Sequence, residues 1–451
     1  MPRSNFYILL FAVLLYALTA GVTLRDRLLV ATLHRIENNA YFDPSAKDLF
    51  EGAMSGMADF LSEEFGDGYS HYVPPSRQTR YLDRLENRYD GFGISIRLHE
   101  NEKENLFFID YPQFGSPAQR AGLHSGDQIL QIDGMPLADK DYLETFLLLR
   151  QKEAETRLSV LPFGQTEPKD VLIHREKFHY DSVEGDYFET DQRIFCLEAH
   201  PTIGYIRITS FSDTTAKEFG DALKRIEQSG AESFILDLRD NPGGDVRNCI
   251  QIARMLISPH PIWGDVIVTV QDRNGTERFR YRYFVLAEGT QRCTLPMVVL
   301  IDGDSASASE ILAAALQDHQ RATLVGTRSF GKGIIQSIIA LPFQSGILQL
   351  TDSEYRRPNG GRIHRKNDAA DSDDWGVIPD KIVELSETEQ LTVIAYRSLR
   401  SNALSMKRSA VLDQVRQQIA ERLDDEEFKF SGAAPYYDPQ LDEAIRILSG
   451  D

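Results

Sequence analysis

Three serines and a lysine within one stretch of the chain have the types and spacing for nucleophilic catalysis. Ser305, Ser307 and Ser309 lie at the start of an Ala/Leu-rich segment, and Lys332 follows between two glycines. A serine at a strand-to-helix turn projects its hydroxyl, and the first N–H groups of the helix can receive a developing oxyanion because they lack intrahelical partners. A lysine acts as a general base only when burial lowers its pKa from about 10.4 toward neutrality.

The elements that would position these side chains are visible on either side of them. The apolar run 297–301 has the length and β-branching of a buried strand, a helix is expected from about 308 to 320, and a short strand at 323–325. A plainer interpretation also fits the same residues. Serines at helix starts are usually N-caps, and a Gly-Lys-Gly sequence is usually a solvated turn. The pattern alone therefore does not decide whether any of the three serines is a nucleophile, or which one.

The whole string 305–336 resembles the signature of the carboxyl-terminal processing proteases, which are serine proteases with a Ser–Lys pair. The string reads SASASE, ALQD and FGKG, followed by a glutamine. The resemblance implies that Ser307 is the nucleophile, that Lys332 is the base and that Gln336 orients the lysine. It implies no cofactor and no metal.

A second string, LDLRDNPGG at 236–244, resembles the other signature of this family. The resemblance implies that the backbone N–H groups of Gly244 and Ala308 form an oxyanion hole, with Gly243 as a less favoured contributor. It also implies a spiral β-sheet flanked by helices, of the type shared with crotonases and Clp proteases.

The order of predicted elements agrees with an α/β core. Strands are expected at 204–208 and 234–238, and helices at 214–228 and 246–256. Such alternation is typical of α/β architecture. Between the two signatures, alternating residues around Asn274-Gly275 predict a hairpin with a type I′ turn.

An inserted module precedes this core. Gly91, Phe92, Gly93 and Ile94 resemble the carboxylate-binding loop of a PDZ domain, and the later SPA, AGL, GD and IDG elements complete the pattern. PDZ domains bind an extended C-terminal segment by adding it to a sheet edge. The resemblance therefore implies protein or peptide substrates with free C-termini.

The N-terminal residues 6–24 are uncharged and long enough to cross a bilayer as a helix. The best cleavage site, at 17–20, puts leucine at position −3, which favours an uncleaved anchor over a signal peptide. Arginines lie on both sides of this segment, so the distribution of positive charge does not predict which end faces the cytoplasm. The resemblance places the catalytic part outside the cytoplasm, on the periplasmic side, or secreted if the segment is cleaved.

These observations divide the chain into a membrane anchor or signal segment (1–25), a helical N-terminal segment (26–86), a PDZ domain (87–178), a serine protease core (179–388) and a C-terminal helical region (389–451). The helical N-terminal segment resembles that of the same proteases, which implies support of the core or a contact in a dimer or other homo-oligomer and implies no chemistry. The C-terminal region is expected to be a cap or a dimer arm.

Bulk properties exclude other classes. A net charge of −19 argues against a nucleic-acid partner. The three cysteines are far apart and form neither a metal motif nor a disulfide framework. The acidic stretch 368–374 is better explained as a solvated loop than as a metal site.

Other mechanisms and functions stay open as alternatives. A histidine triad would need His71, His179 or His364 to be brought to the serine by the fold, and no motif supports it. A PDZ scaffold without catalysis and a crotonase-like acyl-transfer enzyme are the alternative functions.

Overall fold

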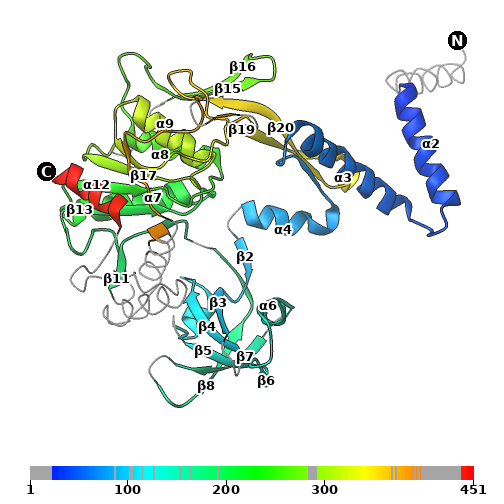
Figure 1. The fold of residues 1–451 in the computed structure, drawn as a ribbon, viewed down its shortest axis with the longest axis horizontal. Helices are drawn as coiled ribbons and strands as arrows, with labels where there is room; N and C mark the ends of the chain where they lie inside the picture. The colour runs from blue at the N-terminus through cyan, green and yellow to red at the C-terminus, as the bar shows by residue number, and fades with distance from the viewer. Residues whose placement is uncertain are drawn as a thin grey trace, which may run out of the picture. The chain divides into compact units, whose positions relative to one another are not determined.

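The computed structural model describes residues 23–450, except 86–87, 101–104, 114, 125–126, 152–154, 163–164, 180, 190–191, 283–291, 367–368, 371–372, 387–388, 391–392, 394–396 and 398–437. The chain forms two compact units (Figure 1). One comprises Met1–Thr79 with Gln336–Thr351, and the other comprises Arg80–Ile335 with Asp352–Asp451.

The larger unit contains a six-stranded sheet with the order β10-β13-β14-β17-β18-β21. The strands are β10 (Val183–Glu184), β13 (Ile203–Ile208), β14 (Ser233–Asp237), β17 (Met297–Ile301), β18 (Thr323–Gly326) and β21 (Lys381–Ile382). From β13 onward the strands are parallel and follow one another in chain order. This one-way progression is what the predicted spiral sheet requires, and the expected α/β fold is confirmed.

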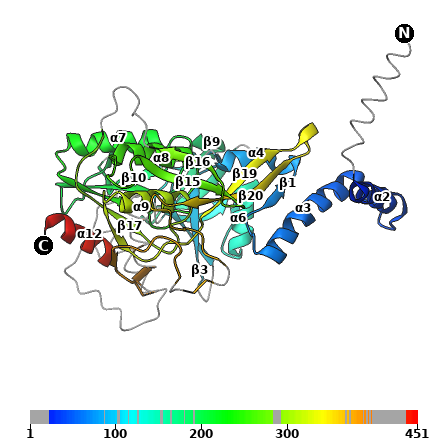
Figure 2. The same ribbon diagram turned by 90° about the horizontal axis from the view of Figure 1, so that it is seen from above.

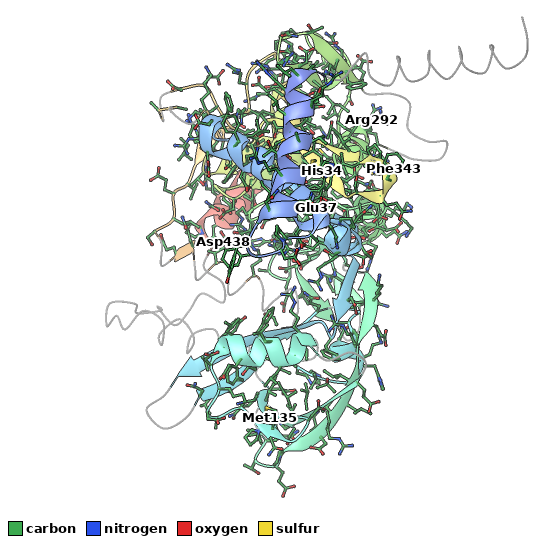
Figure 3. The ribbon with its side chains drawn as sticks, turned by 90° about the vertical axis from the view of Figure 1, so that its right-hand side faces the viewer. His34, Glu37, Met135, Arg292, Phe343 and Asp438 are labelled. Atoms are coloured by element: carbon green, nitrogen blue, oxygen red, sulfur yellow. The ribbon has the colours of Figure 1, made fainter. Side chains whose placement is uncertain are left out.

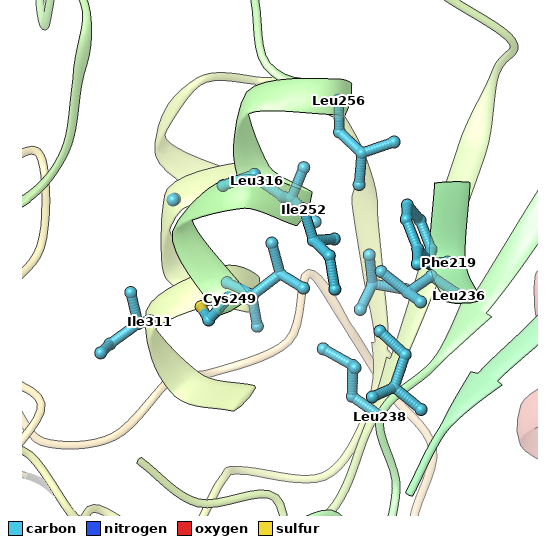
Figure 4. Packing of buried hydrophobic residues seen from close by; sticks show 14 of the residues in the cluster. Phe219, Leu236, Leu238, Cys249, Ile252, Leu256, Ile311 and Leu316 are labelled. Carbon is cyan, nitrogen blue, oxygen red and sulfur yellow. The ribbon is translucent and has the colours of Figure 1, made fainter. Parts of the chain in front are cut away.

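Three helices cover one face of this sheet: α7 (Thr215–Gln228), α8 (Val246–Leu256) and α9 (Ala308–Asp318). Phe219, Leu236, Ile252 and Leu316 belong to the buried cluster between them (Figure 4). Side chains of a strand alternate between the two faces of its sheet, so residues next to these in sequence point the other way. The second face therefore also needs a cover.

The C-terminal helix α12 (Pro439–Ser449) provides that cover. Leu441 and Ala444 pack with Tyr205, Ile235 and Leu300 of the sheet, and Figure 2 shows the helix beside the strands. Of the two roles predicted for the C-terminal region, α12 fulfils that of a cap. Most of the region, 398–437, lies outside the described residues.

A hairpin of β15 (Val266–Asp272) and β16 (Glu277–Arg282) forms where it was predicted, but its turn is different. A type I′ turn needs a positive φ at both central residues. Here the Gly275 N–H donates to Asp272 O, and only Gly275 has a positive φ, of 77°. The Asp272 carboxylate also accepts from the N–H groups of Asn274 and Thr276, at 2.8 and 3.0 Å. This side-chain cap stabilises the longer turn, so the type I′ prediction is wrong.

The PDZ domain has its own core and a sheet of order β3-β4-β5-β7-β8, with β6 beside β5. Met135 of β6 marks this domain in Figure 3. The elements are β2 (Arg88–Gly91), β3 (Ile94–Glu100), β4 (Asn105–Pro112), α5 (Pro117–Arg120), β5 (Gln128–Ile132), β6 (Met135–Pro136), α6 (Tyr142–Gln151), β7 (Glu155–Leu161), β8 (Lys169–His174) and β9 (Glu176–His179). A separate hairpin, β11 (Tyr187–Glu189) with β12 (Gln192–Ile194), follows it.

The smaller unit begins with the predicted helical segment, which forms α2 (Leu24–Asn39) and α3 (Ala46–Phe65). Strand β1 (His71–Val73) pairs with the first half of β20 (Ile347–Arg356), whose second half pairs with β15 in the larger unit. The other elements at its borders are α4 (Pro75–Leu85), β19 (Ile334–Ala340) and the 3-10 turn η1 (Pro342–Gln344).

The predicted membrane anchor at 6–24 lies almost entirely outside the described residues. Within the described part of the chain, no helix combines the length and the apolar character needed to cross a bilayer.

Candidate active site

Ser307 occupies the turn between β17 and α9, as predicted, in a strained conformation. Its φ is 56° and its ψ is −113°, a backbone conformation that residues other than glycine rarely adopt. Strain of this kind persists only where the surroundings impose it, and it is concentrated at functional sites. The turn leaves the Ser307 side chain half-buried, at the start of an otherwise buried helix.

The structure separates the three candidate serines by their surroundings. Ser305 Oγ donates to Leu238 O at 2.8 Å, and Ser309 Oγ donates to Asn241 O at 2.9 Å. Both serines are fully buried. Their hydroxyls stabilise the turn from inside, so Ser307 is the one of the three that a substrate can reach.

The lysine turn is packed closely because it has glycine on both sides of Lys332. A Cβ on Gly333 would lie 2.3 Å from His364 N, and a Cβ on Gly331 would lie 2.7 Å from Arg365 Cβ. Lys332 itself is half-buried. Burial lowers the pKa of Lys332, and the nearby Glu310 opposes this shift only in part. The direction is the one that a general base requires.

Glu310, which the sequence analysis did not single out, joins the two turns. Its Oε2 accepts from the N–H groups of Ser307 and Lys332, both at 2.8 Å. Its Oε1 accepts from Gly331 N at 2.7 Å and from Ser329 Oγ at 2.6 Å. One carboxylate oxygen therefore contacts the backbones of both the predicted nucleophile and the predicted base, which makes them neighbours in space.

Burial raises the pKa of Glu310 to about 7, although its four hydrogen bonds favour the ionised form. The carboxylate is thus ionised on the alkaline side of neutrality, where a neutral lysine also becomes available. The signal for this residue was present in the sequence, because a serine followed three positions later by glutamate is the spacing of a capping box.

The predicted oxyanion hole lies beside Ser307. A Cβ on Gly243 would lie 2.8 Å from Ser307 Cβ and 2.9 Å from Ala308 N, so the glycine loop touches the nucleophile turn. The Gly243 N–H already donates to Asn241 Oδ1 at 2.9 Å. Among the described residues, the N–H groups of Gly244 and Ala308 have no acceptor. These are the two donors that the sequence predicted.

A buried charge cluster supports the strand end that leads into this loop. Arg239 is fully buried between Asp237 and Asp438, at 2.7 and 2.9 Å. It also donates to Gln440 Oε1 at 3.0 Å. Burial opposes ionisation of Asp237, but Arg239 and Arg397 outweigh it and hold the pKa of this carboxyl well below its usual range. The C-terminal segment, where Asp438 precedes α12 (Figure 3), thereby stabilises the loop of Gly243 and Gly244.

Comparison with known proteins identifies the family. A model described as "Peptidase family S41" matches residues 202–383, which contain both signatures, and a model described as "PDZ domain" matches 84–161. Residues 202–383 of the chain belong to peptidase family S41. The resemblance to carboxyl-terminal processing proteases is confirmed by relatives that carry this name.

Two relatives show the extent of the similarity. The "Carboxyl-terminal-processing protease" of Synechocystis sp. is 36% identical over 293 residues, covering 65% of this chain and 62% of that protein. The "Carboxy-terminal processing protease CtpA" of Bacillus subtilis is 29% identical over 389 residues, covering 84% and 77%. The chain thus spans less than two thirds of the Synechocystis protein.

A solved structure of a putative S41 protease from Bacteroides fragilis shares the fold. Its TM-score is 0.52 at 16% sequence identity, over 87% of this chain and 90% of that chain.

Gln336, the third residue that the family resemblance implies for the site, belongs to the smaller compact unit. Its Nε2 donates to Thr351 Oγ1 at 3.2 Å. Its role toward Lys332 stays a prediction from the family resemblance.

The PDZ loop has the donors that its predicted role requires. Phe92 O accepts from Ala118 N, and Gly93 O accepts from Gln113 N at 2.8 Å. The N–H groups of Phe92 and Gly93 have no acceptor in the part of the chain that the structure describes. Gly91 ends β2, and Ile94 begins β3, which packs beside α6.

Of the three candidate histidines, His364 is the one whose backbone lies against the lysine turn. His71 belongs to the smaller unit, where its Nδ1 lies 3.1 Å from Tyr69 O. The His364 backbone packs against Gly333, and the His179 side chain lies outside the described residues. The geometry around Glu310 therefore favours lysine over histidine as the partner of Ser307.

Proposed function

We propose that this chain is a serine endopeptidase that hydrolyses peptide bonds through an acyl-enzyme formed by Ser307 and Lys332. The observation that carries the proposal is the shared contact with Glu310. The N–H groups of Ser307 and Lys332 donate to one carboxylate oxygen. The loop of Gly243 and Gly244 touches the Ser307 turn through Gly243, and within the described residues the N–H groups of Ala308 and Gly244 have no acceptor.

The reaction follows from these positions. Neutral Lys332 takes the hydroxyl proton as Ser307 Oγ attacks the peptide carbonyl, and the Ala308 and Gly244 N–H groups stabilise the oxyanion. The lysine ammonium then gives its proton to the leaving amine, and the C–N bond breaks. Water, deprotonated by the same lysine, hydrolyses the ester and restores Ser307. Gln336 orients Lys332 in this scheme, and no cofactor is needed.

We further propose that the PDZ domain selects substrates by their free C-termini. The N–H groups of Phe92 and Gly93 support this role, because they have no acceptor among the described residues and a terminal carboxylate is a strong acceptor. Helix α6 also exposes Leu143, Phe146 and Leu147. Exposed apolar side chains next to a carboxylate loop favour a substrate with an apolar C-terminal residue.

The enzyme is proposed to be anchored in a membrane by residues 6–24, with the catalytic part outside the cytoplasm. The uncharged run at 6–24 supports the anchor. Large apolar side chains on α2 and α3 are exposed, and they support a homo-oligomer contact through this segment; they include Leu28, Leu29, Phe60 and Phe65.

The proposal is tested by turnover of an unfolded protein with Ser307→Ala. Removing the attacking hydroxyl should lower kcat by several orders of magnitude. Ser305→Ala and Ser309→Ala are matched controls, because each loses only a structural hydrogen bond. Cleavage by Ser307→Ala at the wild-type rate would overturn the assignment of the nucleophile.

C-terminal selection is tested with one peptide in free and amidated form. Amidation removes the terminal charge, and hydrogen bonds to charged groups contribute about 1.5–3 kcal/mol each, so KM should rise roughly tenfold or more. A variant at Gly93 would be a poor test, since its Cβ would lie 2.2 Å from Ser116 Cβ and distort the loop. Equal KM for both peptides would exclude selection by the free terminus. Binding of the peptide C-terminus without any cleavage would instead favour the alternative of a PDZ scaffold without catalysis.

A further inference from the structure

We infer that Thr351 and Asp67 are positioning residues that fix which end of the Gln336 side-chain amide is presented as a hydrogen-bond acceptor. This inference rests on the proposed function, in which Gln336 orients Lys332.

The Thr351 hydroxyl has a single proton and two polar neighbours. Thr351 Oγ1 lies 2.9 Å from Asp67 Oδ1 and 3.2 Å from Gln336 Nε2. An ionised carboxylate can only accept, so the hydroxyl proton goes to Asp67. Thr351 Oγ1 must then accept from its other neighbour. The amide of Gln336 can satisfy it only with the Nε2 end.

Asp67 is held in the ionised form by its donors. Burial would raise the pKa of Asp67, but donors from three neighbouring residues outweigh it and hold the pKa below its ordinary value. Ser70 Oγ donates at 2.5 Å, the Tyr69 and Ser70 N–H groups donate at 3.1 and 3.2 Å, and Thr351 adds its hydroxyl. These donors favour the ionised form, so Asp67 is a carboxylate at neutral pH.

The backbone of Thr351 is fixed by the same loop. Its N–H donates to Ser70 Oγ at 2.9 Å, and the Ser70 hydroxyl proton goes to Asp67. The next residues of β20 toward its start pair with β1, where Leu348 lies opposite Tyr72. Position and hydrogen-bonding direction of Thr351 are thus both set by the loop that follows α3.

This direction has a chemical consequence for a lysine base. With Nε2 bound to Thr351, Oε1 is the other end of the amide. In the proposed function, where Gln336 orients Lys332, that oxygen accepts an N–H of lysine and leaves the amine lone pair for the serine proton. With the amide reversed, the two N–H groups of Nε2 would compete for that lone pair and disfavour the ammonium. Asp67 and Thr351 exclude the reversed amide.

This inference gives the N-terminal segment a part in positioning Gln336, which the family resemblance did not imply. Asp67 and Ser70 lie directly after α3, whose left-handed C-cap residue is Gly66. No sequence motif connects them with Gln336, because Asp67 and Thr351 are 284 residues apart in the chain.

The test is a double-mutant cycle with the full-length protein, measured as kcat and KM on one peptide with a free C-terminus. Thr351→Val keeps the shape of the side chain and removes the hydroxyl, and Thr351→Ser restores it. We expect Thr351→Val to lower kcat about tenfold, the effect of one hydrogen bond, with KM unchanged and the apparent pKa of the pH–kcat profile lowered. Thr351→Ser should recover most of the activity. In a Gln336→Ala background, Thr351→Val should have no further effect on kcat.

Three results would overturn the inference: wild-type kcat for Thr351→Val, an equal loss of kcat in the presence and absence of Gln336, or full activity of Gln336→Ala. Asp67→Asn gives an independent check, since the asparagine NH2 can donate to Thr351 and permit the reversed amide. It should show the same lowered apparent pKa. Ser307→Ala is assayed alongside to distinguish failure of this inference from failure of the proposed function. An active Ser307→Ala would refute the proposed function itself.

Discussion

Glu310→Gln tests whether one carboxylate holds the catalytic turns together. Glutamine has nearly the same shape, but one of its two polar ends donates. If Nε2 replaced Oε2, it would face the N–H groups of Ser307 and Lys332. If it replaced Oε1, it would face the Gly331 N–H and the Ser329 hydroxyl, which can rotate. The second orientation is less costly.

The cost of that orientation can be worked out bond by bond. The Gly331 N–H loses its acceptor, and an unsatisfied buried donor costs about 1–3 kcal/mol. The bonds from Ser307 and Lys332 become neutral ones, which are roughly half as strong, so each loses about 1 kcal/mol. The sum is at least about 3 kcal/mol. We therefore expect Tm to fall by roughly 6–12 °C. The weakened bonds hold the turns of Ser307 and Lys332, so kcat should fall as well, by up to about a hundredfold if the whole loss appears in the activation barrier.

The assay is calorimetry together with kcat and KM on a single peptide. KM should change little, because the PDZ loop is untouched. Glu443→Gln is the matched control: Glu443 pairs with Arg446 on the surface of α12 at 2.7 Å, and such a pair contributes at most about 1 kcal/mol. If Glu310→Gln kept wild-type kcat and a Tm within about 2 °C of the wild type, the reasoning about Glu310 would be refuted.

Three further predictions concern the oxyanion loop, its support and the base. Gly243→Ala should abolish turnover, because the new Cβ would lie 2.7 Å from Ala306 O at a φ of +96°, whereas Gly303→Ala, with no atom within 4 Å, should cleave normally; comparable kcat values for the two would contradict this. Asp438→Ala should lower the free energy of unfolding by about 3–5 kcal/mol in denaturant, since it removes one of the carboxylates that neutralise the buried Arg239. An unchanged midpoint would argue against a stabilising role of this ion pair. Activity should rise with pH as Lys332 loses its proton, with a midpoint below the ordinary lysine pKa of about 10.4, and Lys332→Arg should be inactive at every pH because guanidinium stays protonated; a flat pH profile would exclude lysine as the base.

Local patterns predicted the elements of the core well. Strand β17 and helix α8 have the bounds that the sequence indicated, Met297–Ile301 and Val246–Leu256, because continuous apolar runs and 3.6-residue periodicity directly reflect burial. The hairpin at 266–282 was also predicted, but its turn type was not, since the Asp272 side chain decides it. Propensity rules do not include such a cap.

The site was predictable only where its residues share a signature. The choice of Ser307 among three serines rested on the family resemblance, and its physical reason is visible only in the structure, where Ser305 and Ser309 are buried against backbone carbonyls. Contacts between distant parts of the chain gave no signal. The bond from Thr351 to Asp67 and that from Arg239 to Asp438 both join residues that no local pattern connects.

The bond between Arg239 and Asp438 also has a consequence for biosynthesis. The two residues are 199 positions apart, and a ribosome releases the chain from its N-terminus. Ser307, Lys332 and the glycine loop therefore emerge before the carboxylate and the helix that complete the core. Until then, one face of the sheet lacks its helix, and the Arg239 guanidinium has Asp237 as an acceptor but still lacks Asp438 and Gln440. We expect the nascent chain to become able to hydrolyse peptides only after α12 has been synthesised. Incomplete chains would then not cleave other proteins.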